Sequence, residues 1–172
     1  MLFESDKSAR AEAYKTLSQF FLTPPDEEDL DVIRQDFSLE ASEPIGAIAE
    51  DFHNLFSCPH GSLQPIESVF AFSTEAGYSN VDDVYSRAGL VIHESYEAAP
   101  DHLSIELLFM SYLVENEKTE LEKIFLEQHL MNWVPYYCDE VMKQAKTMFY
   151  REIADIVKDF LTAEYDAYGD QG

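Results

Sequence analysis

The residues best suited to chemistry in this chain are an acid and an imidazole, Asp101 and His102, which follow Pro100 and precede a long apolar run. A proline followed by an acid is typical of a helix start. There the carboxylate can accept hydrogen bonds from free backbone N–H groups, here those of Leu103 or Ser104. The same carboxylate could bind a cationic partner instead, and both interpretations stay open. The helix dipole disfavours a protonated imidazole at His102, which is either a packing residue or part of a recognition site.

Metal-binding atoms also occur at His53, Cys58 and His60, but these residues straddle a predicted helix end without a familiar ligand spacing. Glu50-x-x-His53 is a single Glu-x-x-His, whereas a di-iron bundle needs two on facing helices. No glycine-rich phosphate loop and no His-Glu-x-x-His motif occurs. We therefore predict no catalytic residue, no metal and no cofactor. The alternative, from another functional class, is a metal-dependent helical hydrolase that uses His53, His60 and His102.

The composition is strongly acidic, with 34 acids against 11 bases and a formal net charge of −23 over 172 residues. Such a surface repels phosphate backbones and anionic lipid heads, so we expect no nucleic-acid partner and no stable membrane insertion. It attracts basic peptides. The alternative is that the acids serve solubility. No apolar run approaches the roughly 20 residues that cross a bilayer, and no signal peptide is recognisable. Two cysteines far apart are typical of a reducing compartment, so we expect a cytoplasmic protein.

The acid and the imidazole must be positioned by the helix that they begin. Nearly all of its residues are apolar as far as Val114, and only one narrow polar stripe remains at about 100° per residue. This stripe consists of Ser104, Ser111, Glu115 and Lys118. A helix that is apolar over most of its circumference belongs in the centre of a bundle. Glu106 points away from the stripe, so we expect it to pair with a buried tyrosine or arginine, or to stay solvated near the helix end.

Apolar residues at helical spacing mark further helices along the chain. They are expected near residues 13–21, 26–33, 44–56, 81–92, 121–133, 135–145 and 149–160. The segment 65–72 is ambiguous between one helical turn and extended chain, and Gly89 either lies inside its helix or ends it early. The tail, 165–172, is expected to fray. Because no alternating strand pattern occurs, the predicted fold is all-α, a single globular bundle of roughly eight or nine helices.

Four blocks in register carry a family resemblance. They are Pro100-Asp101-His102-Leu103 with Glu106-Leu107-x-Phe109-Met110, Pro65-x-x-Ser68-Val69-Phe70, Phe125-x-x-x-His129-Leu130-x-x-Trp133, and Phe149-Tyr150 with Ile153 and Phe160. Together these blocks resemble the TorD/DmsD/NarJ family of cytoplasmic chaperones that mature molybdenum-containing redox enzymes. The resemblance covers about residues 8–165. It implies one TorD-like domain over residues 1–172, with an N-terminal lobe at about 1–94, a hinge at about 95–100 and a C-terminal lobe at about 101–165.

The resemblance also implies a function without catalysis. Such a chaperone binds the twin-arginine signal peptide and the apoprotein of a molybdenum oxidoreductase of the dimethyl sulfoxide reductase superfamily, and delays export until the cofactor is inserted. It would act as a monomer or a dimer. Carried over residue by residue, the binding surface would consist of Asp101, His102, Pro100, Phe52, Leu55, Phe56, Pro65 and Ser68. Tryptophans that some members place at the positions of Phe52 and His60 are missing here.

Overall fold

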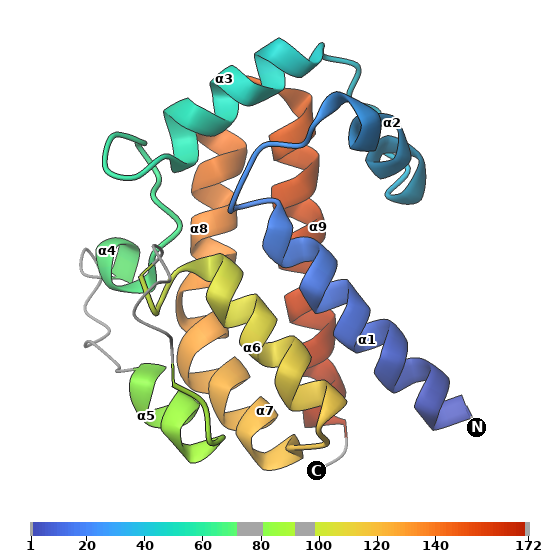
Figure 1. Cartoon of the computed structure of the whole chain (residues 1–172), viewed down its shortest axis with the longest axis vertical. Helices are drawn as coiled ribbons and strands as arrows, with labels where there is room; N and C mark the ends of the chain where they lie inside the picture. The colour runs from blue at the N-terminus through green and yellow to red at the C-terminus, as the bar shows by residue number, and fades with distance from the viewer. Residues whose placement is uncertain (1, 72–80, 92–98, 171–172) are drawn as a thin grey trace.

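The structure, a computed structural model, describes residues 2–71, 81–91 and 99–170. Within these ranges every regular element is a helix, which confirms the predicted all-α class (Figure 1). The elements follow the chain in this order: α1 (Leu2–Gln19), α2 (Glu27–Asp36), α3 (Ile45–Phe56), α4 (Glu67–Ala71), α5 (Val81–Arg87), α6 (Leu103–Glu115), α7 (Thr119–Phe125), the π-helical η1 (Leu126–Leu130), α8 (Met131–Gln144) and α9 (Met148–Gly169). None of the described helices is long and apolar enough to span a membrane.

The longest helices form the body of the molecule. Helices α8 and α9 pack against each other as a pair, and α1 packs along α6. In Figure 1, α3 lies across the ends of α8 and α9, while α4 and α5 lie on the side of α6 and α8 away from α1. A single cluster of buried apolar side chains extends through these elements. Because α1 shares this core with α6, the start of the chain is packed against its second half.

Several helix starts follow from local capping chemistry. Asp26 accepts a hydrogen bond from the backbone N–H of Asp29 at 2.9 Å and begins α2, as the sequence predicts. Pro44 precedes α3, where its fixed φ suits a helix start. Thr147 caps α9 by accepting from the N–H of Tyr150 at 3.3 Å. Gly89 has a φ of +83°, a left-handed conformation that favours glycine, and it follows the early end of α5.

The two serines of the predicted polar stripe face α1, whereas Glu115 is exposed and Lys118 lies beyond the end of α6. The Ser104 hydroxyl donates to the carbonyl of Ser18 at 2.6 Å, and the Ser111 hydroxyl donates to the carbonyl of Ala11 at 2.8 Å. Small side chains with one donor let two helix backbones approach closely while no hydroxyl is left unpaired. On the other faces of α6, Leu103, Leu107, Met110 and Leu113 are fully buried. The predicted central position of this helix is therefore confirmed.

Two predicted helix boundaries are wrong. The chain does not break before Pro135, because α7, η1 and α8 follow one another directly and Pro135 lies inside α8. Proline has no N–H to donate, so the helical run continues through Pro135 without the backbone hydrogen bond that another residue could form there. The tail also does not fray at residue 165, because α9 continues to Gly169 and the Tyr168 hydroxyl donates to Glu122 at 2.8 Å.

The predicted division into two lobes with a hinge stays a prediction. Residues 95–98 of that hinge lie outside the described residues, as does part of the N-terminal lobe. The ambiguous segment 65–72 contains the short helix α4 (Glu67–Ala71), which Ile66 precedes in an isolated bridge, and residue 72 lies outside the described part of the chain. It is this short helix that meets the start of α6.

Candidate binding site at the start of the central helix

Two distant parts of the chain join at the start of α6. Ile66 and His102 form an isolated antiparallel bridge. On either side of it, the N–H of Glu67 donates to the carbonyl of Asp101 at 3.0 Å, and the N–H of Leu103 donates to the carbonyl of Pro65 at 2.8 Å. The bridge places the starts of α4 and α6 side by side. Of the sequence-predicted site residues, it brings together Pro65, Ser68, Pro100, Asp101 and His102.

Asp101 caps α4, whereas the sequence predicts that it caps α6. Its Oδ2 accepts a hydrogen bond from the backbone N–H of Ser68 at 2.7 Å, so its carboxylate caps α4 and not α6. The expected bonds to Leu103 or Ser104 are absent from the described contacts, because His102 occupies the cap position of α6. No described residue donates to the second oxygen, Oδ1. Asp101 is half-buried and Pro100 beside it is exposed.

His102 is the cap of α6. Its Nδ1 accepts a hydrogen bond from the N–H of Ser104 at 3.1 Å, which fixes the neutral ring with its proton on Nε2. The side chain is buried, and this burial lowers the pKa of His102 to about 4, against the smaller opposite effect of the Asp101 charge. Histidine is not among the common helix caps, so sequence reasoning assigned this role to Asp101.

Beneath the two helix starts, Glu106 is fully buried. The indole Nε1 of Trp133 donates to its Oε1 at 3.1 Å, while no described residue forms a hydrogen bond with its Oε2. Burial raises the pKa of this carboxyl well above its usual range, and the nearby Glu67 charge raises it further. The prediction of a tyrosine or arginine partner, or of a solvated position, is therefore wrong, because the partner is an indole. A neutral, protonated carboxyl group can be buried at this place at a much lower cost in free energy than a charged carboxylate.

A second buried acid, Glu67 at the start of α4, was not anticipated as a site residue. Its two oxygens lie 3.1 and 3.3 Å from Nδ1 of His129, and both side chains are buried. His129 belongs to η1, and its ring stacks on Phe125 with centroids 4.8 Å apart. Sequence reasoning noted His129 only within a family-like block. Nothing in the sequence signals its pairing with Glu67, which is 62 positions away.

The aromatic part of the predicted surface lies in the core. Phe52, Leu55 and Phe56 form the inward face of α3 and are 5%, 2% and 2% exposed. Phe56 packs against Tyr150 and Tyr137, with ring centroids 5.3 and 6.5 Å away. These three α3 residues therefore offer almost no surface in this conformation, contrary to the expected surface position. Their role in binding stays a prediction.

Tyr137 connects this aromatic group to α4. Its hydroxyl donates to the carbonyl of Leu63 at 2.7 Å, and its ring lies 5.4 Å from that of Phe70. The adjoining loop needs a glycine at position 61, because a Cβ there would lie 2.5 Å from the carbonyl oxygen of Leu55. One apolar side chain of α4, Val69, is exposed at 53%.

The metal-dependent alternative has no support. His102 is buried as a helix cap, whereas His53 and His60 are exposed, and Nδ1 of His53 lies 2.9 Å from the Ser57 hydroxyl. In the part of the chain that the structure describes, no group of three or more His, Cys, Asp or Glu side chains could hold a metal ion.

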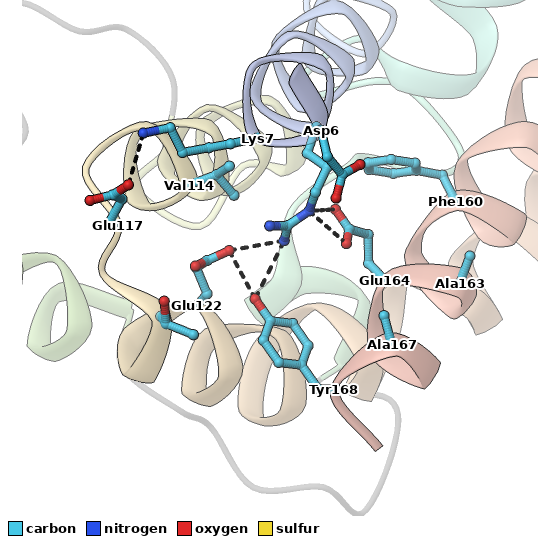
Figure 2. A pocket seen from close by; sticks show the side chains of 12 residues that line it. Asp6, Lys7, Val114, Glu117, Glu122, Phe160, Ala163, Glu164, Ala167 and Tyr168 are labelled. Atoms are coloured by element: carbon cyan, nitrogen blue, oxygen red, sulfur yellow. Dashed lines mark hydrogen bonds and ion pairs between the residues drawn. The ribbon is translucent and has the colours of Figure 1, made fainter. Parts of the chain in front are cut away.

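A separate hollow of about 570 Å³ lies at the other end of α6, between α1, α7 and α9. Figure 2 shows Glu122 and Tyr168 on one side and Glu164 on the other, pointing toward a common centre. At that centre, Nε of Arg10 donates to both Glu164 oxygens at 3.0 Å, and Nη2 donates to Glu122 at 3.0 Å. The carboxylates raise the pKa of Arg10 in spite of its burial. This network ties α1 to α7 and α9, and it contains none of the predicted site residues.

Comparison with known proteins assigns the family. The family described as nitrate reductase delta subunit matches residues 4–139, and the chain belongs to it. This confirms the TorD/DmsD/NarJ resemblance that the four sequence blocks carry. The match includes the residues around the start of α6, from Pro65 on one side of the bridge to Trp133 in α8.

Curated relatives carry chaperone names. The chaperone protein TorD of Vibrio atlanticus (strain LGP32) is 29% identical over 121 residues, which are 60% of this chain and 53% of the relative. A TorD chaperone of Psychrobacter sp. (strain PRwf-1) is 26% identical over 140 residues, 72% of this chain and 62% of the relative. A perchlorate reductase assembly chaperone protein of Dechloromonas aromatica (strain RCB) is 26% identical over 137 residues, 68% and 61% of the two chains. The matched segment thus spans less than two thirds of each relative's length.

Proposed function

We propose that this protein is a cytoplasmic chaperone, not an enzyme, that assembles a molybdenum-containing oxidoreductase. It binds the twin-arginine signal peptide and the apoprotein of its client, assists cofactor insertion and holds the client back from export. Membership of the nitrate reductase delta subunit family and the chaperone names of the relatives support this proposal. The hydrolase alternative gains nothing from the scattered histidines.

The observation that carries the proposal is the state of the Asp101 carboxylate. Its Oδ2 is fixed by the N–H of Ser68 at 2.7 Å, while its Oδ1 accepts nothing from any described residue. A carboxylate held in place on a partly exposed site is a preorganised acceptor for a guanidinium, because charge-assisted bonds are strong and little side-chain freedom is lost on binding. The exposed Val69 lies next to this acceptor on α4 and suits the apolar part of a signal peptide.

Charge complementarity supports the same partner. A chain with a formal net charge of −23 attracts basic segments and repels nucleic acid and anionic membranes. The site needs no metal and no cofactor of its own for this role, since binding requires only an acceptor and apolar contacts. The number of subunits does not enter the proposal, and monomer and dimer both fit it.

Affinity capture from the native cell tests the proposal. Tagged protein is expected to retain a molybdoenzyme precursor that still carries its signal peptide, and Asp101→Asn should retain much less of it. Glu140→Gln is a matched control, because it removes one negative charge from a partly exposed side chain on α8 that, among the described residues, pairs with Lys143 and Gln144 of its own helix. Recovery of no molybdoenzyme with the wild-type protein would contradict the proposal, as would equal recovery with all three proteins.

A further inference from the structure

We propose that the buried pair Glu67–His129 is a positioning pair for client binding: it holds α4 where the N–H of Ser68 fixes the Asp101 carboxylate. The inference rests on the proposed function, because it is Asp101 that meets the client. Neither Glu67 nor His129 touches the client, and both act through Asp101. Three observations carry the inference: Asp101 and α4 hydrogen-bond to each other, the buried contact between Glu67 and His129 anchors α4, and a π-helical turn presents His129.

Helix α4 and Asp101 hold each other in place. The helix has only five residues, far fewer than a helix needs to be stable on its own. Asp101 satisfies its first two N–H groups, since the carbonyl accepts from Glu67 at 3.0 Å and Oδ2 accepts from Ser68 at 2.7 Å. A shift of α4 would therefore remove the donor that orients the carboxylate.

A buried polar contact and an aromatic contact hold α4 against the bundle. Glu67 contacts Nδ1 of His129 at 3.1 and 3.3 Å, and the Phe70 ring packs on Trp133 and Tyr137 at 6.1 and 5.4 Å. Burying polar side chains is expensive even when they are paired, and apolar side chains of similar volume are often as stable. A buried pair at this place is therefore better explained by the fixed position that it imposes than by stability.

Two further features beneath the Asp101 site, a second buried acid and a π-helical turn, support the positioning role. Glu106 is fully buried near Glu67, and its Oε2 has no partner among the described residues. In η1, the wide turn sets His129 toward Glu67, and Trp133 follows in α8 with its indole on Glu106. Single π-helical turns are rare and occur frequently at functional sites. Here the turn presents His129 to Glu67, and the start of α8 that follows it presents Trp133 to Glu106, beneath the Asp101 site.

A double-mutant cycle tests whether Glu67 acts through Asp101. The probe is a synthetic peptide with two consecutive arginines followed by an apolar run, titrated by calorimetry into wild type, Glu67→Gln, Asp101→Asn and the double variant. Glu67→Gln should weaken binding about tenfold, and the double variant should bind no more weakly than Asp101→Asn alone. Wild-type affinity in Glu67→Gln, or losses that simply add, would overturn the inference.

Glu122→Gln separates positioning from stability. Glu122 is a buried carboxylate like Glu67, and it pairs with Arg10 at 3.0 Å, but it lies in the hollow at the other end of α6. Glu122→Gln should therefore lower the melting temperature and leave the affinity for the peptide unchanged. If Glu67→Gln does not fold, His129→Gln breaks the same pair and takes its place in the cycle.

Hydrogen exchange gives a readout that needs no peptide. In folded Glu67→Gln, or in His129→Gln, the amide of Ser68 should exchange faster than in wild type, because α4 is no longer held against Asp101. Unchanged exchange at Ser68 would overturn the inference. Failure of wild type to bind the peptide at all contradicts the proposed function itself, whereas normal binding with additive losses contradicts the positioning role alone.

Discussion

His102 acts as a hydrogen-bond acceptor in the folded protein, and this fixes how it responds to pH. Nδ1 accepts from the N–H of Ser104, which a doubly protonated ring cannot do. Burial lowers its pKa from 6.5 to about 4. In the window between these values the unfolded chain binds a proton at His102 and the folded chain does not. The free energy of unfolding therefore falls as the pH falls through this window.

His102→Asn should flatten part of the pH dependence of stability. Asparagine is a good helix cap and does not titrate, so the cap is kept and the linked proton is removed. Between about pH 7 and about pH 4 the wild type should lose roughly 2 to 3 kcal/mol more than the variant. Urea unfolding at a series of pH values measures this difference. Parallel stability curves for the two proteins would contradict the cap role of the neutral ring.

Glu106 makes the free energy of unfolding change with pH in the opposite direction to His102. Its folded pKa lies above the ordinary 4.5, so its contribution is full below that value and is lost as the pH rises through the folded pKa. Glu106→Gln imitates the protonated form, so we expect stability within about 1 kcal/mol of wild type at low pH and an advantage that grows with pH. Glu106→Leu should cost about 1 to 3 kcal/mol, because it leaves the Trp133 indole N–H unpaired. Unfolding free energies from urea titrations test both variants, and Glu106→Gln unfolding earlier than wild type at high pH would contradict a protonated Glu106.

At the scale of elements, the site depends on α4 being held by a residue outside it. Asp101 contributes a carbonyl and a carboxylate oxygen to the start of α4, while α6 is capped independently by His102. The two helix starts can therefore be perturbed separately. Loss of the Asp101 side chain affects α4 and leaves α6 intact.

Asp101→Ala should lower stability by about 1 kcal/mol, the usual cost of losing a cap, and Asp101→Asn should cost much less because its side-chain oxygen still accepts from Ser68. Thermal melts measure the loss, and hydrogen exchange locates it. In Asp101→Ala the amide of Ser68 should exchange faster while that of Ser104 stays protected by His102. Faster exchange at Ser104 with unchanged exchange at Ser68 would contradict this account, because it would mean that Asp101 caps α6.

The sequence predicts those elements whose causes are local. Asp26 and Pro44 mark the starts of α2 and α3 correctly, because capping and proline chemistry act within a few residues. The π-helical η1 is not predictable in this way, since one wide turn of five residues leaves no periodic pattern. Because the sequence gives no sign of η1, it predicts two separate helices with a break before Pro135. The extension of α9 depends on Tyr168 bonding to Glu122, a contact between distant parts of the chain.

The site likewise contains features with local causes, which the sequence predicts, and features that depend on contacts between distant residues, which it does not predict. Asp101 and His102 are adjacent in sequence, so their position at a helix start could be predicted, but their acceptor roles depend on which helix each one meets. Glu67 and His129 are 62 positions apart, and only the folded chain brings them together. The α3 residues Phe52 and Phe56 carry apolar character that fits a binding trough and a core equally well, and the fold places them in the core.

At the scale of the whole molecule, the dominant feature is a formal net charge of −23. The few bases are partly used internally, as with Arg10 between Glu122 and Glu164. A basic peptide approaching such a surface is steered toward it over distances of about one Debye length, roughly 10 Å at 0.1 M salt. The association rate should therefore depend on salt more than the dissociation rate does.

Stopped-flow mixing with a twin-arginine peptide at increasing salt measures this steering. The association rate constant should fall by about tenfold or more between low and physiological ionic strength, whereas the dissociation rate constant changes little. A control peptide with the same apolar run and no net charge should show no such dependence. Association rates of the basic peptide that are independent of salt would mean that the acidic surface serves solubility alone.

The measurement that tests the central claim most directly is a calorimetric comparison of two peptides on two proteins. One peptide carries consecutive arginines before an apolar run, and the other carries lysines in their place. Lysine keeps the charge but cannot form the bidentate bond that a fixed carboxylate offers to arginine. Wild type should prefer the arginine peptide by about tenfold, and Asp101→Asn should lose most of that preference while it keeps its melting temperature. Equal affinity of wild type for both peptides, or a preference that survives in Asp101→Asn, would contradict the account.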